Sequence, residues 1–213
     1  MKYFPVLPSF IPFLIKDVVF HIPNNKRRIF LTFDDGPHPE STPLLLQLLQ
    51  QWNIKAVFFC LGKNIEQFPE LTNQIIKDGH IIGNHGYDHL NGWSTDTNTY
   101  FLNFERGKKI SGSNLFRPPY GKIGLSQFMK IKKHTQIVLW SIMPGDFQAE
   151  MDTQACANTI LRHTKEGSII VLHDNHGFIN KTLEILRKCL PVLKERGFEF
   201  GLIRDPDSIS DRV

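Results

Sequence analysis

The sequence predicts an α/β protein with a parallel sheet or barrel in one domain. From residue 28 onward, a short apolar segment is repeatedly followed by a longer amphipathic one, which is the pattern of strands joined by helical crossovers. No linker divides this pattern. Polar residues gather just after the apolar segments, and 213 residues are enough for one sizeable core.

Seven short apolar segments are expected to form the strands. They cover residues 28–33, 56–61, 80–84, 115–116, 136–141, 168–173 and 198–202. Amphipathic helices are expected between them. A parallel barrel places the carboxyl ends of its strands on one face, so this order also predicts where polar residues meet.

Capping signals mark three of the expected helices. Thr42 is expected as the N-cap of the first, with Pro43 in its first turn and a leucine-rich run behind it. Another helix is expected to end at Asp78 and Gly79. The last is expected over residues 181–196 and closes on Gly197.

Two flanking segments are separated from the domain of residues 28–203. Residues 1–27 are expected to form an N-terminal extension that packs on the domain. Prolines at positions 5, 8 and 12 break its apolar run, which falls short of the ~20 uninterrupted apolar residues of a spanning helix. No transmembrane segment is therefore expected. Residues 204–213 form a polar tail that is expected to fray.

Charge and cysteine content limit the partners and the compartment. The formal charge of +4 is mildly basic and lacks the dense Lys and Arg stripe of phosphate-backbone binding, so we expect no nucleic-acid partner. An anionic glycan would still be attracted. Three cysteines cannot all pair, and Cys60 ends an apolar run, so reduced thiols are expected. With no clear signal peptide, the cytoplasm is favoured over the cell envelope, and the oligomeric state stays open.

Polar residues capable of chemistry fall at or just beyond the carboxyl ends of the expected strands. They are Asp34, Asp35, His85, Arg117, Asp146 and His173. In a βα barrel these strand ends form one face, so residues far apart in the sequence converge there. The sequence therefore predicts a single active-site face.

Two adjacent carboxylates and a pair of histidines carry the most specific signal. Asp34 and Asp35 leave an apolar run and enter a turn, where neighbouring side chains diverge, so one can face a metal ion and the other a water. His85 and His89 stand at i and i+4 and would face one ion if the segment is helical. Two histidines with one aspartate leave coordination positions open, as in catalytic sites. A hydrated turn and a chance histidine spacing are the alternatives.

Five spaced motifs follow one another along the chain. They are Thr32-Phe33-Asp34-Asp35-Gly36-Pro37, His85-Gly86-Tyr87-Asp88-His89, Arg117-Pro118-Pro119-Tyr120-Gly121, Met143-Pro144-Gly145-Asp146-Phe147 and Leu172-His173-Asp174. In this order they closely resemble the motifs of the polysaccharide deacetylase family, also called carbohydrate esterase family four. The resemblance implies a distorted (β/α) barrel and the metal-dependent removal of acetyl groups from N-acetylated sugars.

The resemblance also implies a role for each position. It makes Asp35, His85 and His89 the ligands of one divalent metal ion, with zinc expected first and cobalt or nickel compatible with the same ligands. It makes Asp34 the general base and His173 the general acid. A divalent ion acidifies water and polarises an amide carbonyl, which are the two things that slow amide hydrolysis lacks.

Three further positions support this chemistry in the family. Arg117 would hold Asp34 ionised, the alternative being a surface ion pair. Asp146 would orient His173 and raise its pKa. The backbone N–H of Tyr120 is the first one available after two prolines, and it would stabilise the oxyanion.

Substrate contacts are expected from Tyr120, Phe147 and Leu172. Phe147 stands where the family usually has tryptophan and still offers an apolar wall to a sugar ring. Leu172 would line the pocket for the acetyl methyl group, although a core leucine explains it equally well. Met143 and Gly86 also depart from the family pattern, which bears on glycan preference and metal affinity more than on reaction type.

We therefore expect a metal-dependent hydrolase that removes N-acetyl groups from an amino-sugar polymer or oligomer, such as peptidoglycan or a chitin-like glycan. Trp93 lies in a polar stretch and is a candidate for stacking on sugar, whereas Trp140 lies inside an expected strand and is assigned to the core. One alternative is an amidohydrolase for a small amide or imide, for which Phe147 leaves room. The other is an inactive carbohydrate-binding relative, which predicts lost ligands or a lost base.

Overall fold

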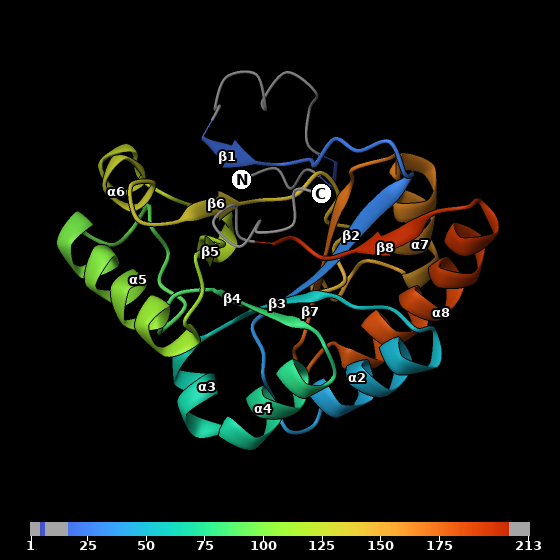
Figure 1. Cartoon of the computed structure of the whole chain (residues 1–213), viewed down its shortest axis with the longest axis horizontal. Coiled ribbons are helices and arrows are strands. Elements are labelled where there is room, and N and C mark those ends of the chain that lie inside the picture. Colours follow the sequence, from blue (N-terminus) through green and yellow to red (C-terminus); the bar gives the residue numbers. More distant parts are fainter. Residues whose placement is uncertain (1–4, 7–16, 205–213) are drawn as a thin grey trace, which may run out of the picture.

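A parallel sheet surrounded by helices forms the body of the protein (Figure 1). The computed structural model describes residues 5–6 and 17–204. Eight strands make up the sheet. They are β1 (Val18–Val19), β2 (Arg28–Asp34), β3 (Val57–Cys60), β4 (Ile81–Asn84), β5 (Leu115–Phe116), β6 (Gln136–Val138), β7 (Ile169–His173) and β8 (Glu199–Gly201).

The sheet curls until its two ends approach each other. Its strand order is β1-β6-β5-β4-β3-β2-β7, and β8 pairs with the first part of β2. Beyond the end of β6, Ile142 forms a parallel bridge with Ile170 of β7. This contact joins the two sides of the curl, so the predicted single-domain, distorted (β/α) barrel is confirmed. All seven expected strands form, and β6 is shorter than expected.

Seven α-helices and one 3-10 turn are found in the described part of the chain. They are α2 (Thr42–Gln51), α3 (Gly62–Gln67), α4 (Pro69–Lys77), α5 (Thr97–Ser111), η1 (Pro119–Gly121), α6 (Leu125–Ile131), α7 (Thr153–His163) and α8 (Ile179–Glu195). The expected glycines at 79 and 197 follow α4 and α8 with φ values of 81° and 78°. Helix α8 begins two residues before its expected start.

The first helix corrects one detail of the prediction. Ser41, not Thr42, occupies the N-cap position, and Thr42 is already helical. Neither hydroxyl caps the helix, because Ser41 donates to Oδ1 and Thr42 to Oδ2 of Asp174, each at 2.5 Å. The two hydroxyls instead fasten the start of the helix to the residue that follows β7.

Alternation along β2 separates apolar from polar side chains. Phe33 faces the helices and packs on Phe58 of β3 with ring centroids 5.1 Å apart. Phe30 belongs to a different apolar cluster, built from strand residues inside the barrel. Thr32 and Asp34 follow Phe30 at intervals of two, so they share its inner face. The strand therefore places Asp34 in the barrel interior, whereas Phe33 packs between the sheet and the helices.

The described part of the N-terminal segment is built into the sheet. Strand β1 pairs with β6, and the carbonyl of Pro5 accepts a hydrogen bond from the N–H of Met143 at 2.9 Å. These contacts join Pro5 and β1, which belong to the expected extension, to the sheet. The rest of that extension, residues 1–4 and 7–16, and the predicted fraying tail from residue 205 lie outside the described residues.

The cysteines lie in the core. Cys60, Cys156 and Cys189 are buried and free. Burial raises the pKa of the Cys60 thiol, so it stays protonated and packs as a small apolar side chain. In the described ranges, no helix combines the length and the apolarity that crossing a membrane requires.

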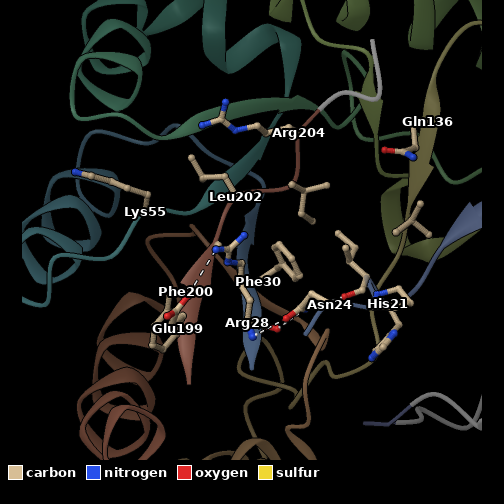
Figure 2. Close-up of a pocket in the computed structure, with 15 residues that line it drawn as sticks. His21, Asn24, Arg28, Phe30, Lys55, Gln136, Glu199, Phe200, Leu202 and Arg204 are labelled. Atoms are coloured by element: carbon tan, nitrogen blue, oxygen red, sulfur yellow. Dashed lines mark hydrogen bonds and ion pairs between the residues drawn. The ribbon is translucent and has the colours of Figure 1, made fainter. Parts of the chain in front are cut away.

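A cavity of about 760 Å³ lies at the amino ends of the strands (Figure 2). Its lining includes Arg28 at the start of β2, Gln136 at the start of β6 and Phe200 of β8. Arg28 and Glu199 form an ion pair across β2 and β8 with N and O 3.6 Å apart. Both side chains are substantially exposed, at 39% and 61%.

Candidate metal centre and active site

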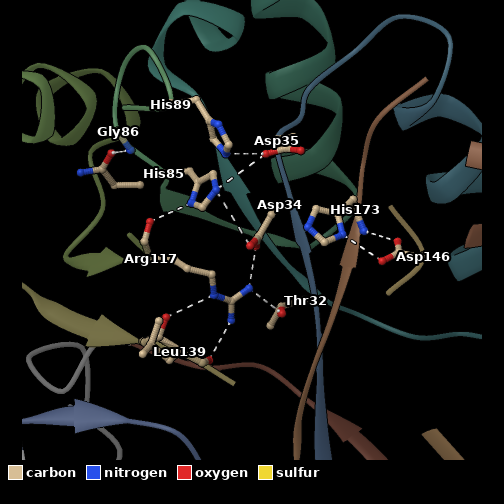
Figure 3. Close-up of polar contacts among 12 residues, drawn as sticks. Thr32, Asp34, Asp35, His85, Gly86, His89, Arg117, Leu139, Asp146 and His173 are labelled. Carbon is tan, nitrogen blue, oxygen red and sulfur yellow. Dashed lines mark hydrogen bonds and ion pairs between the residues drawn. The ribbon is translucent and has the colours of Figure 1, made fainter. Parts of the chain in front are cut away.

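Strand β2 ends with two carboxylates that point in different directions (Figure 3). Asp34 is the last strand residue and lies opposite Phe59 of β3 and His173 of β7. Asp35 follows with a φ of 82°, a left-handed conformation that non-glycine residues seldom adopt. The amide of Asn64 donates to the Asp35 carbonyl at 2.8 Å and helps to hold this turn. The predicted divergence of the two carboxylates is thus a property of the backbone.

Asp35, His85 and His89 gather at one point. Their ligand atoms lie within 4.8 Å of one another, and among the residues described they form the one such group of His, Cys, Asp or Glu. Oδ1 of Asp35 is 3.7 Å from Nε2 of His85 and 3.2 Å from Nε2 of His89. This buried oxygen accepts no hydrogen bond from the described residues. Such an orphaned acceptor calls for a cation.

The protonation state of His85 fits a metal ligand. Its Nδ1 lies 2.7 Å from the carbonyl oxygen of Arg117, which only accepts, so Nδ1 carries the proton and Nε2 presents a lone pair toward Asp35. Burial lowers the pKa of His85 to about 4, which keeps the imidazole neutral. Burial alone would raise the pKa of Asp35, but the nearby histidines hold it below its usual range. Neutral imidazoles with one carboxylate fit a divalent ion.

The two histidines lie on a loop, so the helical interpretation of their spacing is wrong. Gly86 and His89 have φ values of 77° and 58°, both left-handed, and the loop folds until the rings of His85 and His89 are 5.1 Å apart. Asn103 of α5 braces this loop, because its Oδ1 accepts the N–H of Tyr87 at 2.9 Å. A Cβ at position 86 would lie 2.9 Å from that Oδ1. Gly86 therefore permits this bracing contact, because a side chain at position 86 would crowd the Oδ1 of Asn103.

Arg117 is fully buried, which excludes the alternative of a surface ion pair. Its Nη1 donates to Oδ1 of Asp34 at 2.6 Å and to the hydroxyl of Thr32 at 2.8 Å. Nε and Nη2 donate to the carbonyls of Val138 and Leu139. The guanidinium is thus fixed by four acceptors, and it fixes the orientation of Asp34 in turn.

His173 is held by a carboxylate, as predicted for the acid. Its Nδ1 lies 2.9 Å from Oδ1 of Asp146, and its backbone N–H donates to Oδ2 at 2.7 Å. Thr182 of α8 also donates to Oδ2 at 2.9 Å. Burial alone would lower the pKa of His173, but Asp146 and, to a smaller extent, Asp35 and Asp34 raise it to about 9.

Comparison with known proteins agrees with this geometry. The family described as polysaccharide deacetylase matches residues 21–136. The chain belongs to the polysaccharide deacetylase family. The matched range runs from before β2 to the start of β6, so it contains the three candidate ligands, Asp34 and Arg117. The predicted membership in carbohydrate esterase family four is confirmed.

Relatives within the polysaccharide deacetylase family are named for two kinds of glycan. A peptidoglycan-N-acetylglucosamine deacetylase of Bacillus cereus is 37% identical over 196 residues, covering 88% of this chain and 92% of that protein. A chitooligosaccharide deacetylase of Azorhizobium caulinodans is 33% identical, with 83% and 93% covered. The crystal structure of a peptidoglycan N-acetylglucosamine deacetylase matches with a TM-score of 0.84 at 33% identity, covering 91% of this chain and 94% of that one.

A cavity of about 340 Å³ opens over the polar groups. It is lined by Asp34, Asp35, His85, His89, Tyr120, Gly121, Lys122, Trp140, Met143, Phe147, Gln148 and His173. The predicted ligands, base and acid therefore share one space with the predicted contact residues Tyr120 and Phe147. The rings of Phe147 and His173 meet edge to face with centroids 4.8 Å apart.

Two apolar side chains differ in whether they line the cavity. Leu172 is fully buried in the cluster that packs against the helices and is absent from the cavity lining, because alternation in β7 points it away from His173. Its interpretation as a core leucine fits this position. Trp140 packs against the inner apolar cluster of Phe30, in agreement with its expected place in the core, but it is only half-buried and also lines the cavity, because β6 ends at Val138.

Tyr120 combines an available N–H with an exposed ring. Its φ is 60°, and the ring packs edge-on against His89 with centroids 4.5 Å apart. The hydrogen bonds of the surrounding turn use Gly121 and Lys122 as donors. No acceptor for the Tyr120 N–H is found among the described residues, so this donor is left for a ligand.

Asp174 is a buried carboxylate for which the sequence analysis predicts no role. Its oxygens accept the hydroxyls of Ser41 and Thr42, each at 2.5 Å, and its N–H donates to the carbonyl of Asp34 at 2.8 Å. Burial raises the pKa of Asp174 to about 6 against the effect of the two hydroxyls. Asp174 therefore ties β7, the turn that begins at Asp34 and helix α2 together.

Proposed function

We propose that this chain is a metal-dependent hydrolase that removes N-acetyl groups from an amino-sugar polymer or oligomer. The proposal is carried by one observation. A single cavity is lined by a candidate metal-ligand set whose Asp35 Oδ1 has no hydrogen-bond partner, by the fixed carboxylate of Asp34 and by the imidazole of His173. Amide hydrolysis needs a group that activates the carbonyl, a base and an acid, and these three components could supply them in that order. The deacetylase names of the relatives support the choice of an N-acetylated glycan.

Asp35, His85 and His89 would hold the ion. Three protein ligands leave positions open for water and substrate. A divalent ion would supply Lewis-acid chemistry there, acidifying water and polarising an amide carbonyl. Zinc is the first choice for one carboxylate and two imidazoles, and cobalt and nickel accept the same donors.

Asp34 would act as the general base. Its Oδ1 is committed to Arg117, whereas its Oδ2 borders the cavity, 4.0 Å from Nε2 of His85. Because Arg117 prevents the carboxylate from rotating away, Oδ2 is the atom placed to take a proton from the attacking water.

His173 would act as the general acid. Asp146 binds Nδ1, which leaves Nε2 for the substrate. A pKa of about 9 keeps the ring protonated at neutral pH, so Nε2 can donate its proton to the departing amine. The N–H of Tyr120 would meanwhile donate to the oxyanion of the tetrahedral intermediate.

The experiment that tests the proposal couples metal analysis to acetate release. Purified protein is assayed on N-acetylated chito-oligosaccharides and on peptidoglycan, before and after chelation and after addition of zinc, cobalt or nickel. We expect acetate release from at least one glycan, its loss on chelation and its return with metal. Release from a small amide or imide alone would favour the amidohydrolase alternative. Ion binding without turnover on any substrate would favour an inactive relative.

The role of His173 has a separate test. His173→Ala should lose most amide hydrolysis but spare an activated ester, because a good leaving group needs little protonation. Equal losses on ester and amide would count against His173 as the acid. The matched control is His80→Ala, since His80 is a buried histidine outside the cavity.

A further inference from the structure

A lysine lies between two exposed aromatic rings at the catalytic cavity. Lys122 follows η1 and lines the cavity together with Tyr120. Its Nζ is 5.7 Å from the centroid of the Tyr120 ring and 5.4 Å from that of Trp93. Each ring is 57% exposed. Large apolar faces left in water around one ammonium, beside a catalytic cavity, have the composition of a ligand surface.

Buried hydrogen bonds hold this surface in shape. Gln127 of α6 is almost fully buried, and its amide donates to the carbonyls of Gly92 and Thr95 at 2.9 Å each. Its Oε1 accepts the N–H of Gly124 at 2.8 Å. A Cβ at position 92 would lie 2.5 Å from the Lys122 carbonyl, so the two loops touch. Gln127 therefore fixes the loop of Trp93 against the loop of Lys122.

The positive charge of the Lys122 ammonium is available to pair with a ligand. Lys132 pairs with Asp17 at 2.8 Å, but no carboxylate among the described residues lies within ion-pair distance of Lys122. Aromatic faces position a cation without neutralising it. The Lys122 ammonium is thus oriented at the cavity and still able to pair with an anion.

We propose that Trp93, Tyr120 and Lys122 form a subsite for a carboxylate-bearing sugar next to the sugar that is deacetylated. In this subsite the rings contact the apolar face of the sugar and Lys122 pairs with its carboxylate. The proposal rests on the proposed function and narrows its substrate class. A chitin-like chain is neutral, whereas a peptidoglycan strand whose stem peptides have been removed carries a free lactyl-ether carboxylate on alternate sugars. The Lys122 subsite selects the anionic chain.

The test compares glycans that differ in charge. Peptide-free peptidoglycan strands, the same strands with methyl-esterified carboxylates, and chitotetraose are assayed for kcat and KM with metal-loaded protein. Lys122→Gln should raise KM about tenfold on the carboxylated strands, the order of one charge-assisted hydrogen bond, and change the neutral glycans by less than ~2-fold. Lys122→Arg should restore most of the affinity. High salt should shrink the difference.

The matched control is Lys130→Gln. Lys130 also stands over an aromatic ring, 3.8 Å from the centroid of Phe101, but outside the cavity, so its loss should leave all three glycans unchanged. Calorimetry in an Asp34→Asn background measures the same preference without turnover. Absence of acetate release from every glycan contradicts the proposed function, and the binding preference still decides the subsite. Equal binding of carboxylated and esterified strands, or equal losses on all glycans in Lys122→Gln, overturns the subsite.

Discussion

The two ends of the barrel each have a cavity, and the smaller of the two cavities holds the candidate active site. At the amino ends of the strands the cavity measures about 760 Å³, and its ion pair, Arg28 with Glu199, is substantially exposed at 3.6 Å. At the carboxyl ends it measures about 340 Å³, and the pair formed by Arg117 and Asp34 is buried at 2.6 Å. Solvent screens the first pair and not the second. The candidate active site is thus recognised by charged groups that are buried close together, and not by the volume of the cavity.

The largest expected effect tests the carboxyl end directly. Asp35→Ala should release the metal and lower kcat/KM by at least ~10³-fold, because the ion and its three ligands act as one unit. His89→Ala should do the same. Metal content after dialysis and acetate release measure both effects. Asp88→Ala is the matched control, since Asp88 is an exposed carboxylate on the histidine loop outside the ligand set.

The next effect separates the base from the ligands. Asp34→Asn should retain the metal and lose ~10²–10⁴-fold in kcat, the usual contribution of a general base. It should also lower the free energy of unfolding by on the order of 3 kcal/mol, because Arg117 stays buried without its counter-charge. Metal analysis, single-turnover kinetics and denaturant unfolding measure the three quantities. Full activity in Asp34→Asn would show that another group takes the proton.

A smaller effect is expected in the pH profile. His173 must be protonated to act as the acid, so kcat/KM should fall as the pH rises through its pKa of about 9. Asp146→Asn should move this basic limb toward ~6.5, the value of an unperturbed imidazole, without loss of metal. Thr182→Val removes one hydrogen bond to Asp146 but no charge, so it should move the limb less. An unmoved limb in Asp146→Asn would contradict the assignment.

The same pair links pH to stability. Because the folded pKa of His173 is raised, its contribution to stability is complete below pH ~6.5 and is lost as the pH rises through about 9. Asp146→Asn should therefore flatten the dependence of the unfolding free energy on pH across this window, as measured by denaturant unfolding.

The smallest effect belongs to the amino end. Glu199→Gln should change kcat/KM by less than ~2-fold and the free energy of unfolding by less than ~1 kcal/mol, as for other exposed pairs. Steady-state kinetics and denaturant unfolding check both values. A tenfold loss of activity would remove the contrast between the two ends and assign a role to the larger cavity.

The strands and the convergence of their polar ends were predictable, whereas the faces of some side chains were not. The four residues before His173 are all apolar, since β7 is buried on both sides. Such a strand shows no polar alternation, so the face of Leu172 follows only from its neighbour: once His173 faces the cavity, alternation turns Leu172 toward the helices. Trp140 packs against the core cluster as expected, but its place in the cavity lining was not predictable, because the apolar run continues past Val138, where the strand ends.

The identity of the candidate ligands was predictable from the sequence, but the backbone conformation that brings them together was not. The spacing of His85 and His89 suggested a helix, and the structure instead uses left-handed residues to fold a loop. The contact that braces this loop comes from Asn103, 14 residues beyond His89 in the sequence and on another element. Local spacing carries no information about such a partner, because only tertiary packing brings it close.

The left-handed backbone of Asp35 has a consequence for how this protein can lose its activity. Asparagine tolerates this conformation about as well as aspartate, and better than nearly all other side chains except glycine. Asp35→Asn would therefore pass the folding requirement of the turn while removing the only anionic donor of the ligand set. A change of one base in a codon separates the two residues. At this position a single substitution can thus remove the proposed activity and leave the fold intact. An inactive relative can arise in this way without passing through a misfolded protein.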